Sequence, residues 1–244
     1  MEQTLPETST PVASPALPPV TDLLMDTFAD LRDNLVEYLL AALGMLLVMI
    51  PAMLVLYGLM ALGVVPGLLA QDEVMLVLGV YAGIFVALPV FALILLFPSV
   101  SLSRAAWHHV AEEEPLGISS PFSRLFEDVG SVLLLKLLLG VLTVVGLMMC
   151  YLPALLVAIA TVFALPALIA HRLSPVAALK LSLEHTQRNL TWHLGFWGLG
   201  FVVTLVAGYI PIVGGLLGMV FYQVYVMKGY KAVFGAGPEP VIAA

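Results

Sequence analysis

Residues 38–71, YLLAALGMLLVMIPAMLVLYGLMALGVVPGLLAQ, contain no Asp, Glu, Lys or Arg. A helix needs only about 20 predominantly apolar residues to cross a membrane. Three further stretches lack these charged residues, namely 74–103, 137–171 and 189–227. Each of them exceeds the roughly 18 residues that indicate a membrane-spanning helix. The sequence therefore predicts an all-α, polytopic membrane protein.

The composition supports this prediction and excludes other classes. Hydrophobic residues make up 61% of the 244 residues and charged residues only 10%, against about 25% charged in an average soluble domain. The net charge of −7 argues against nucleic-acid binding, which requires a basic surface. The single cysteine, Cys150, excludes an internal disulfide and a multi-cysteine metal site. The first apolar segment follows a long polar stretch and is too long for a signal peptide, so we expect it to remain as a span.

The lengths of the apolar stretches predict six spans in three hairpins. A helix rises about 1.5 Å per residue and the hydrocarbon core is about 30 Å thick, so division of the first stretch at Pro51 would leave two halves too short to cross. The two longest stretches are each expected to turn at a proline, Pro153 or Pro211, and the first hairpin at Pro66. The expected spans are about 38–65, 74–97, 129–151, 153–170, 192–209 and 212–230. They form a membrane domain over residues 35–234, between disordered tails at 1–20 and 235–244.

The nine Lys and Arg residues predict the orientation. With six spans, every one of them lies on the side of the two termini, and none lies in the opposite loops at 66–73, 151–153 and 210–212. Cytoplasmic loops are enriched in Lys and Arg. Both termini are therefore expected in the cytoplasm, with the chain in the inner membrane of a bacterium.

Amphipathic segments are expected on the cytoplasmic side. One covers residues 21–34, where an apolar face lies opposite Asp22, Asp26, Asp30 and Asp33. Elbow helices are expected to begin near Ser99, after Ser120-Pro121 and after Ser174-Pro175, since Ser caps helices and Pro suits their first turn. Helices in the headgroup plane are normally basic.

The helix at 21–34 is acidic, so anionic lipid would repel it. It is expected to rest on the basic elbow formed by Arg172, Lys180 and Arg188, or on a partner protein.

Few residues are candidates for chemistry. Lys136 lies about two turns inside the third span, where its stem could reach the interface or its charge could contact a buried ion or substrate. No Asp, Glu or His is expected at the membrane centre, so a proton relay is disfavoured. The five histidines, which all lie near the cytoplasmic interface, could converge on a metal or a haem, but they show no metal-type spacing such as H-E-x-x-H. Glu112-Glu113-Glu114 is interpreted as a solvated loop. No catalytic, cofactor-binding or metal-binding residue is assigned.

Residues 151–189, YLPALLVAIATVFALPALIAHRLSPVAALKLSLEHTQRN, resemble a group of bacterial inner-membrane proteins, the YciC-like family. The group includes the membrane domain attached to some glycerophosphodiester phosphodiesterases. The shared pattern is a proline turn, a span ending in Ala-x-Pro, and a helix with Ala-x-x-x-Ser and a closing Asn. The matching residues are Pro153, Ala164, Pro166, Ala178, Ser182 and Asn189. The resemblance implies a six-helix inner-membrane domain, mostly without an assigned activity.

Two hypotheses on function follow. The first is a non-enzymatic accessory or organising subunit of a membrane complex, whose partners are the lipid bilayer and other membrane proteins. The second is a transporter or lipid-handling permease, in which Arg104, Arg172, Lys180 and Arg188 meet an anionic phospholipid headgroup. A cavity that reaches the middle of the membrane would favour the second hypothesis, and a tightly packed bundle the first.

Overall fold

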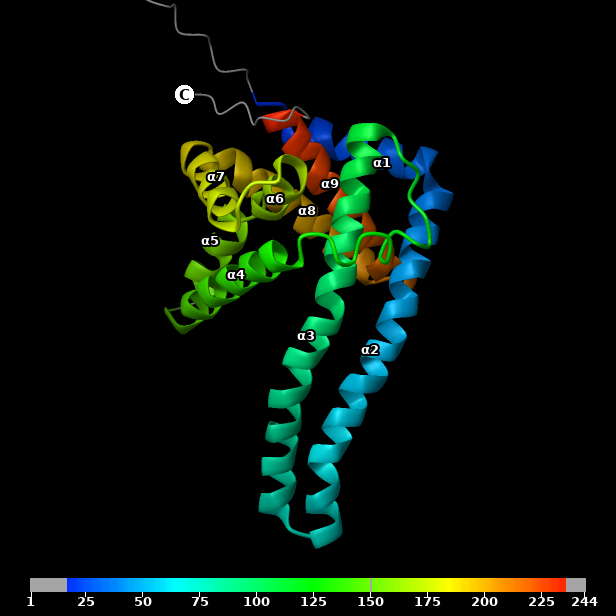
Figure 1. The fold of residues 1–244 in the computed structure, drawn as a ribbon, viewed down its shortest axis with the longest axis vertical. Coiled ribbons are helices and arrows are strands. Elements are labelled where there is room, and N and C mark those ends of the chain that lie inside the picture. Colours follow the sequence, from blue (N-terminus) through cyan, green and yellow to red (C-terminus); the bar gives the residue numbers. More distant parts are fainter. Residues whose placement is uncertain (1–16, 150, 236–244) are drawn as a thin grey trace, which may run out of the picture.

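The computed structural model describes residues 17–149 and 151–235, and all regular structure in this part of the chain is helical (Figure 1). The all-α prediction is therefore confirmed. The helices are α1 (Val20–Asp33), α2 (Leu35–Ala70), α3 (Glu73–Glu112), α4 (Val129–Met149), α5 (Tyr151–Ala160), α6 (Ala164–His171), α7 (Pro175–Arg188), α8 (Leu190–Gly208) and α9 (Val213–Phe234). Of the predicted tails, residues 1–16 and 236–244 lie outside the described residues, as does Cys150. Pro18, within the predicted N-terminal tail, accepts a hydrogen bond from the Trp192 indole at 2.8 Å.

Four helical stretches of the described chain are long and apolar enough to cross a membrane. They are α2, α4, the combined stretch Tyr151–His171, and α8. The first part of α3, Glu73–Ala87, is a shorter apolar segment. The chain thus has the helices of a multi-pass membrane protein.

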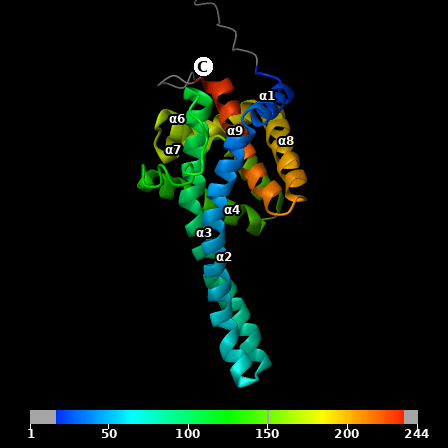
Figure 2. The same cartoon turned by 90° about the vertical axis from the view of Figure 1, so that its right-hand side faces the viewer.

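Helices α2 and α3 form a long antiparallel hairpin that projects beyond all the other helices in both views (Figures 1 and 2). Glycines bring the two backbones together, because a Cβ at Gly63 would meet the carbonyl oxygen of Gly79 and a Cβ at Gly67 would meet the backbone of Leu76. The predicted turn at Pro66 is wrong, since α2 continues through Pro51 and Pro66 to Ala70. The chain reverses at Gln71, which has a left-handed conformation.

Asp72 follows as the N-cap of α3, accepting the N–H groups of Val74 and Met75. Its side chain replaces the helical partners that the first N–H groups of a helix lack.

Two of the three predicted elbow helices are also wrong. The segment from Ser99 is a continuation of α3, which runs without a break to Glu112. Residues 118–128 form turns and not a helix; there Ser120 Oγ accepts the N–H of Gly117, and its carbonyl accepts a hydrogen bond from Ser101. The third elbow is α7, whose N-cap Ser174 accepts the N–H of Ala177 as expected.

The predicted turn at Pro153 is wrong, because Pro153 lies within α5, which begins at Tyr151. The stretch after α4 is also interrupted where one continuous span, 153–170, is expected. Helices α5 and α6 are separated by turns at residues 161–163, and Pro166 lacks the N–H that would bond to a carbonyl one turn earlier. Ser182 of α7 completes this break, because its hydroxyl accepts the N–H of Phe163 at 3.2 Å and donates to the carbonyl of Ala160 at 2.7 Å. The Ala-x-x-x-Ser pattern thus has a structural use: buried Ala178 and Ser182 hold α7 against the interruption.

Helix α9 is the central helix of the bundle, with buried residues along most of its length from Gly214 to Phe234. The predicted turn at Tyr209-Ile210-Pro211 is confirmed, because α8 ends at Gly208 and α9 begins at Val213. Gly214 and Gly218 pack against Ala207 and Thr204 of α8, as Gly79 and Gly83 pack against α2. Both glycine pairs therefore serve the close packing of neighbouring helices.

The α8–α9 hairpin ends well short of the α2–α3 hairpin. Ser103 on α3 donates to Gln223 on α9 at 2.9 Å, and Lys231 on α9 donates to the carbonyl of Val110 at 2.7 Å. The two helices therefore run in the same direction with Ser103 and Gln223 level. From that level, α3 extends back 30 residues to Glu73, or about 45 Å, whereas α9 extends back 10 residues to Val213, or about 15 Å.

Candidate functional site: a layer of charged side chains

Most charged contacts of the described chain lie at one end of the bundle, where the ends of α3 and α9 meet α1 and the turns before α4. We call this group the charged layer. Its members are Asp26, Asp30, Glu37, Arg104, His108, His109, Glu112, Glu114, Arg124, Lys228 and Lys231. The long apolar parts of α2 and α3 extend away from it.

Asp30 of α1 is the most densely bonded carboxylate in the charged layer. It accepts hydrogen bonds from Asn34 at 2.6 Å, from the Tyr38 hydroxyl at 3.2 Å and from His109 Nε2 at 3.2 Å. Lys228 Nζ lies 3.2 Å from Asp30 and 2.7 Å from Asp26. These contacts fasten α1 to α3 and α9.

The surroundings of Asp30 and His109 favour the charged form of each side chain. Burial alone would raise the pKa of Asp30, but the hydrogen bonds from His109 and Asn34 and the charge of Lys228 outweigh it and hold this pKa well below its ordinary value. Burial alone would lower the pKa of His109, but the bonds to Asp30 and to the carbonyl of Glu114 outweigh it and raise this pKa. Both His109 ring nitrogens face acceptors, so both must donate, which requires the imidazolium form.

The predicted support for α1 is only partly right. The acidic helix does rest on basic residues of its own chain, but its contacts in the structure are with Lys228 and His109 and not with the expected elbow. Lys180 is an exposed partner of Glu184 at 3.6 Å within α7. The outer side of the cluster is a groove of about 450 Å³ lined by five carboxylates, Asp26, Asp30, Asp33, Glu37 and Glu113.

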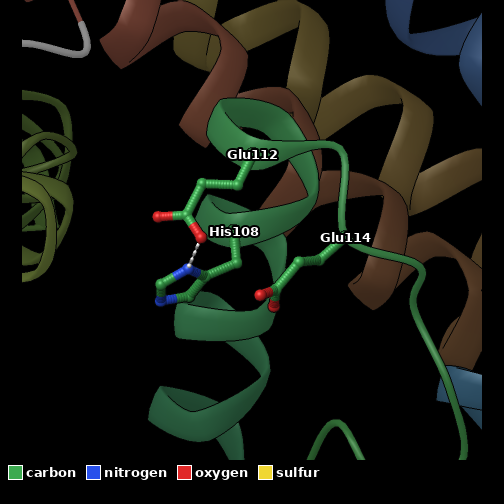
Figure 3. Close-up of side chains that lie close together, drawn as sticks. All are labelled: His108, Glu112 and Glu114. Atoms are coloured by element: carbon green, nitrogen blue, oxygen red, sulfur yellow. Dashed lines mark ion pairs between the residues drawn. The ribbon is translucent and has the colours of Figure 1, made fainter.

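His108, Glu112 and Glu114 form the one trio of potential metal ligands found among residues 17–149 and 151–235, and their ligand atoms lie within 4.8 Å of one another (Figure 3). His108 and Glu112 are one turn apart on α3, with Nδ1 and Oε2 separated by 2.9 Å. Glu114 follows the end of the helix. The interpretation of the three glutamates as a solvated loop missed this histidine.

The neighbouring Arg124 makes the trio a poor metal site. Its Nη1 contacts Nε2 of His108, and Nη2 lies 3.9 Å from Glu114. Arginine can only donate, so Nε2 must accept and the proton of a neutral His108 lies on Nδ1, facing Glu112. A metal would have to displace that proton beside a permanent positive charge. The arrangement is better described as an Arg–His–Glu chain that joins the turns at 118–128 to α3.

Arg104 serves the same segment. It is almost fully buried and donates to the carbonyls of Arg124 and Glu127, both in the turns before α4. With Arg124 and Arg172 it lines a cavity of about 170 Å³ beside α6, together with Glu112, Glu127 and Asp128. Of the four cations proposed to meet a headgroup, Arg104 and Arg172 line this cavity, and Lys180 and Arg188 are not among its lining residues.

His171, His185 and His193 each pair with other rings and lie apart from the trio of His108, Glu112 and Glu114. Nδ1 of His185 is 2.7 Å from Nε2 of the fully buried His193, and Phe163, Trp192 and Phe234 surround the pair. Burial and the charge of Arg188 lower the pKa of His185, so a neutral hydrogen-bonded pair is expected. His171 Nδ1 lies 2.7 Å from the Tyr230 hydroxyl. Convergence of all five histidines on one metal is not seen.

No family model, curated protein or solved structure matches this chain. The resemblance to the YciC-like family stays a prediction from residues 151–189. The partly buried Lys136 on α4 stays without an assigned role.

Proposed function

We propose that this chain is a non-enzymatic accessory or organising subunit of a membrane complex. Six helices embed it in a bacterial cytoplasmic membrane as the three hairpins α2–α3, α4–α5/α6 and α8–α9. The charged layer and both termini lie on the cytoplasmic side, in keeping with the distribution of all nine Lys and Arg residues.

The length of the α2–α3 hairpin is the observation that supports a partner. Below the level of Ser103 the hairpin extends about 45 Å, whereas the hydrocarbon core is about 30 Å thick. A tilt of about 40°, the upper end of the usual range, would still leave the hairpin spanning about 34 Å. If the charged layer lies at the cytoplasmic face, the tip segment, residues 60–83, passes beyond the opposite face of the hydrocarbon.

The surface of this tip segment is apolar. Its exposed large side chains include Leu62, Leu68, Leu69, Val74, Leu78 and Tyr81, and α2 and α3 cover only one face of each other. Exposed apolar patches of this kind mark sites of protein association when they lie in water. A membrane partner with an apolar surface on the extracytoplasmic side would cover the tip segment.

The charged contacts fit the same proposal. In the charged layer, Asp30, His109 and Lys228 hold α1, while Arg104 and Arg124 hold the turns at 118–128. These groups are used to fix the cytoplasmic end of the bundle. Substrate chemistry would instead need polar groups that are open to a ligand.

The cavity beside α6 supports the second candidate, a lipid-handling permease. Its three arginines and three carboxylates, at the end of the apolar helices, could accommodate a phospholipid headgroup that carries both phosphate and ammonium charges. A permease also needs a path through the membrane, and this cavity lies at the level of the charged layer.

Mild-detergent purification of the native protein, followed by mass spectrometry of the intact assembly, tests the proposal. We expect a copurifying membrane protein at fixed stoichiometry, which is lost from Leu69→Asn in the tip segment and retained by Val176→Asn on α7, an exposed apolar position far from the tip. A lone monomer that carries one stoichiometric phospholipid would overturn the proposal in favour of the permease. Retention of the partner by both variants would show that the tip segment is not its binding surface.

A further inference from the structure

The turns of the α2–α3 and α8–α9 hairpins differ in chemistry. The first turn contains Gln71, Asp72 and Glu73, which are all exposed and include two carboxylates. The second consists of Tyr209, Ile210, Pro211 and Ile212. Exposed fractions of 79% for Tyr209, 61% for Ile210 and 67% for Ile212 show that the described part of the chain leaves most of each side chain uncovered. The first turn suits water and the second suits hydrocarbon.

The depth of the second turn agrees with its chemistry. It lies about 15 Å below the level of Gln223, where the charged layer begins, and this is about half of a 30 Å hydrocarbon core. The hairpin cannot move deeper by itself, because Asp26 and Asp30 of α1 hold Lys228 at the other end of α9, and His109 of α3 holds Asp30 in turn. A deeper position would draw these charges into the hydrocarbon.

Most backbone N–H groups of the second turn donate hydrogen bonds within the hairpin. The N–H groups of Tyr209, Ile210 and Gly214 donate to the carbonyls of Val206, Ala207 and Ile210, and Pro211 has no N–H. The N–H of Val213 donates to the carbonyl of Pro211 at 2.7 Å. This bond closes a γ-turn around Ile212, which has φ 62° and ψ −68°.

A β-branched residue rarely adopts such a conformation. In this conformation the N–H of Val213 is bonded within the turn. A turn in hydrocarbon needs such internal bonds, because no water is available to replace them.

We infer that the α8–α9 hairpin ends inside the bilayer, in the cytoplasmic leaflet, and that the protein therefore prefers a membrane surface whose cytoplasmic leaflet is convex. The inference rests on the membrane orientation proposed above but not on the proposed partner. It replaces two complete crossings expected from the sequence, at 192–209 and 212–230, by one shallow hairpin, and it leaves both termini on the cytoplasmic side.

The preference for curvature follows from the unequal cross-sections of the two leaflets. Helices α2 and α3 extend beyond all the other described helices into the opposite leaflet, whereas α8 and α9 add their volume to the cytoplasmic leaflet only. Figures 1 and 2 show this shape, a broad body on a narrow two-helix stem. Apolar elements inserted into one leaflet bind more strongly where that leaflet is expanded by curvature. The partner surface is therefore a convex lipid surface on the cytoplasmic side.

Cysteine labelling in sealed membranes tests the depth, with single cysteines placed in a Cys150→Ala background. A membrane-impermeant maleimide should label Lys180→Cys from the cytoplasmic side and Gln71→Cys from the opposite side. It should label Ile210→Cys from neither side until detergent is added. Labelling of Ile210→Cys from the extracytoplasmic side, at a rate like that of Gln71→Cys, would overturn the inference. So would labelling of Ile210→Cys from the cytoplasmic side before detergent is added.

Reconstitution tests the curvature preference independently of any cysteine. The purified protein is inserted into small sonicated and large extruded vesicles of one lipid composition, and trypsin added outside measures the fraction with the charged layer outward. We expect the ratio of outward to inward protein to be several-fold larger in the small vesicles than in the large ones. Equal orientation ratios in both vesicle sizes would overturn the preference. Recovery of a partner from native membranes is a separate measurement, so failure of the proposed function remains distinguishable.

Discussion

The α2–α3 and α8–α9 hairpins share a packing device and differ in almost everything else. In both, glycines let one backbone contact the other, through Gly63 and Gly79 in the first and through Gly214 and Ala207 in the second. The first hairpin ends in charged residues about 45 Å from the level of Ser103 and the second in apolar residues about 15 Å from it. Two apolar hairpins of one protein can therefore end at different levels, and the chemistry of each turn agrees with the membrane depth inferred for it.

The two hairpins also differ in what supports them. Helix α9 is buried by its neighbours along most of its length, whereas the tip segment of α2–α3 lies beyond all the other described helices (Figures 1 and 2). Helix α9 is thus part of the protein core, and the tip segment depends on lipid or on a partner.

A lysine near each turn gives the largest expected difference. Ile210→Lys places a charge near the middle of the bilayer, at a cost of about 2.5–3.5 kcal/mol. Ala70→Lys places the same charge at the last turn of α2, next to Gln71 and water, where a cation also suits the helix C-terminus. We expect Ile210→Lys to reduce the yield of folded protein in membranes severalfold and Ala70→Lys to leave it unchanged. Equal yields of the two variants would contradict unequal depths.

Alanine at the paired glycines tests the feature that the hairpins share. A Cβ at Gly63 or Gly214 would meet a backbone carbonyl, and overpacking of this kind costs about 1–3 kcal/mol. Gly58 and Gly215 face open space and are the matched controls, where alanine is expected to be neutral or slightly stabilising because glycine disfavours a helix by about 0.5–1 kcal/mol. The thermal unfolding midpoint in lipid nanodiscs measures the difference. If Gly63→Ala were as harmless as Gly58→Ala, the close contact of α2 with α3 would be wrong.

Asp30→Asn should loosen α1 without unfolding either hairpin. Hydrogen bonds to a charged group contribute about 1.5–3 kcal/mol, so a loss of about 2 kcal/mol corresponds to roughly 30-fold faster exchange of the α1 amide hydrogens. Asp22→Asn, at an exposed position of the same helix, is the control. Exchange in α9 should stay unchanged. If the α1 amides were equally protected in both variants, the contacts of Asp30 would not be what holds α1 on the bundle.

The pH dependence of α1 protection is the smallest expected effect. His109 has a pKa raised above its ordinary 6.5, so its contribution is complete below pH 6.5 and is lost as the pH rises through the raised value. Asp30 has a pKa lowered from 3.8, so its contribution is complete above pH 3.8 and is lost as the pH falls through the lowered value. Protection of α1 should therefore be greatest between these limits.

The variant His109→Gln keeps a donor but does not titrate in this range. After correction for intrinsic exchange rates, its protection should show no decline above pH 6.5. A decline as large as that of the native protein would assign the titration to another group.

The sequence predicted the apolar helices better than the places where they end. Pro51 was correctly kept inside one helix, because two half-length pieces could not cross a membrane. Pro66 was interpreted as a turn, yet it lies in α2. The stronger local signal was Asp72, whose carboxylate accepts the N–H groups of Val74 and Met75 and so caps the start of α3. Ser120-Pro121 has the pattern of a helix start, but hydrogen bonds to Gly117 and Ser101 hold that segment in turns.

Of the charged layer, the sequence predicted the acidic face of α1 but not its partners. Asp30 is separated from His109 by 79 positions and from Lys228 by nearly the whole chain, so no local pattern joins them. His108 and Glu112 are one turn apart on α3 and could have been recognised as a pair, whereas Arg124 joins them only through the turns before α4.

Hydropathy and charge on their own determined that this chain is helical and apolar enough for a membrane, and they predicted that its cations lie on one side, because these properties are sums over residues. Depth is not such a sum. Ser103 lies level with Gln223 only after α3 has packed on α9, and this contact leaves one hairpin long and the other short. On the membrane orientation proposed above, tertiary packing therefore keeps the apolar α8–α9 turn in hydrocarbon, since a helix can enter the membrane only as far as the charges fastened to its other end allow.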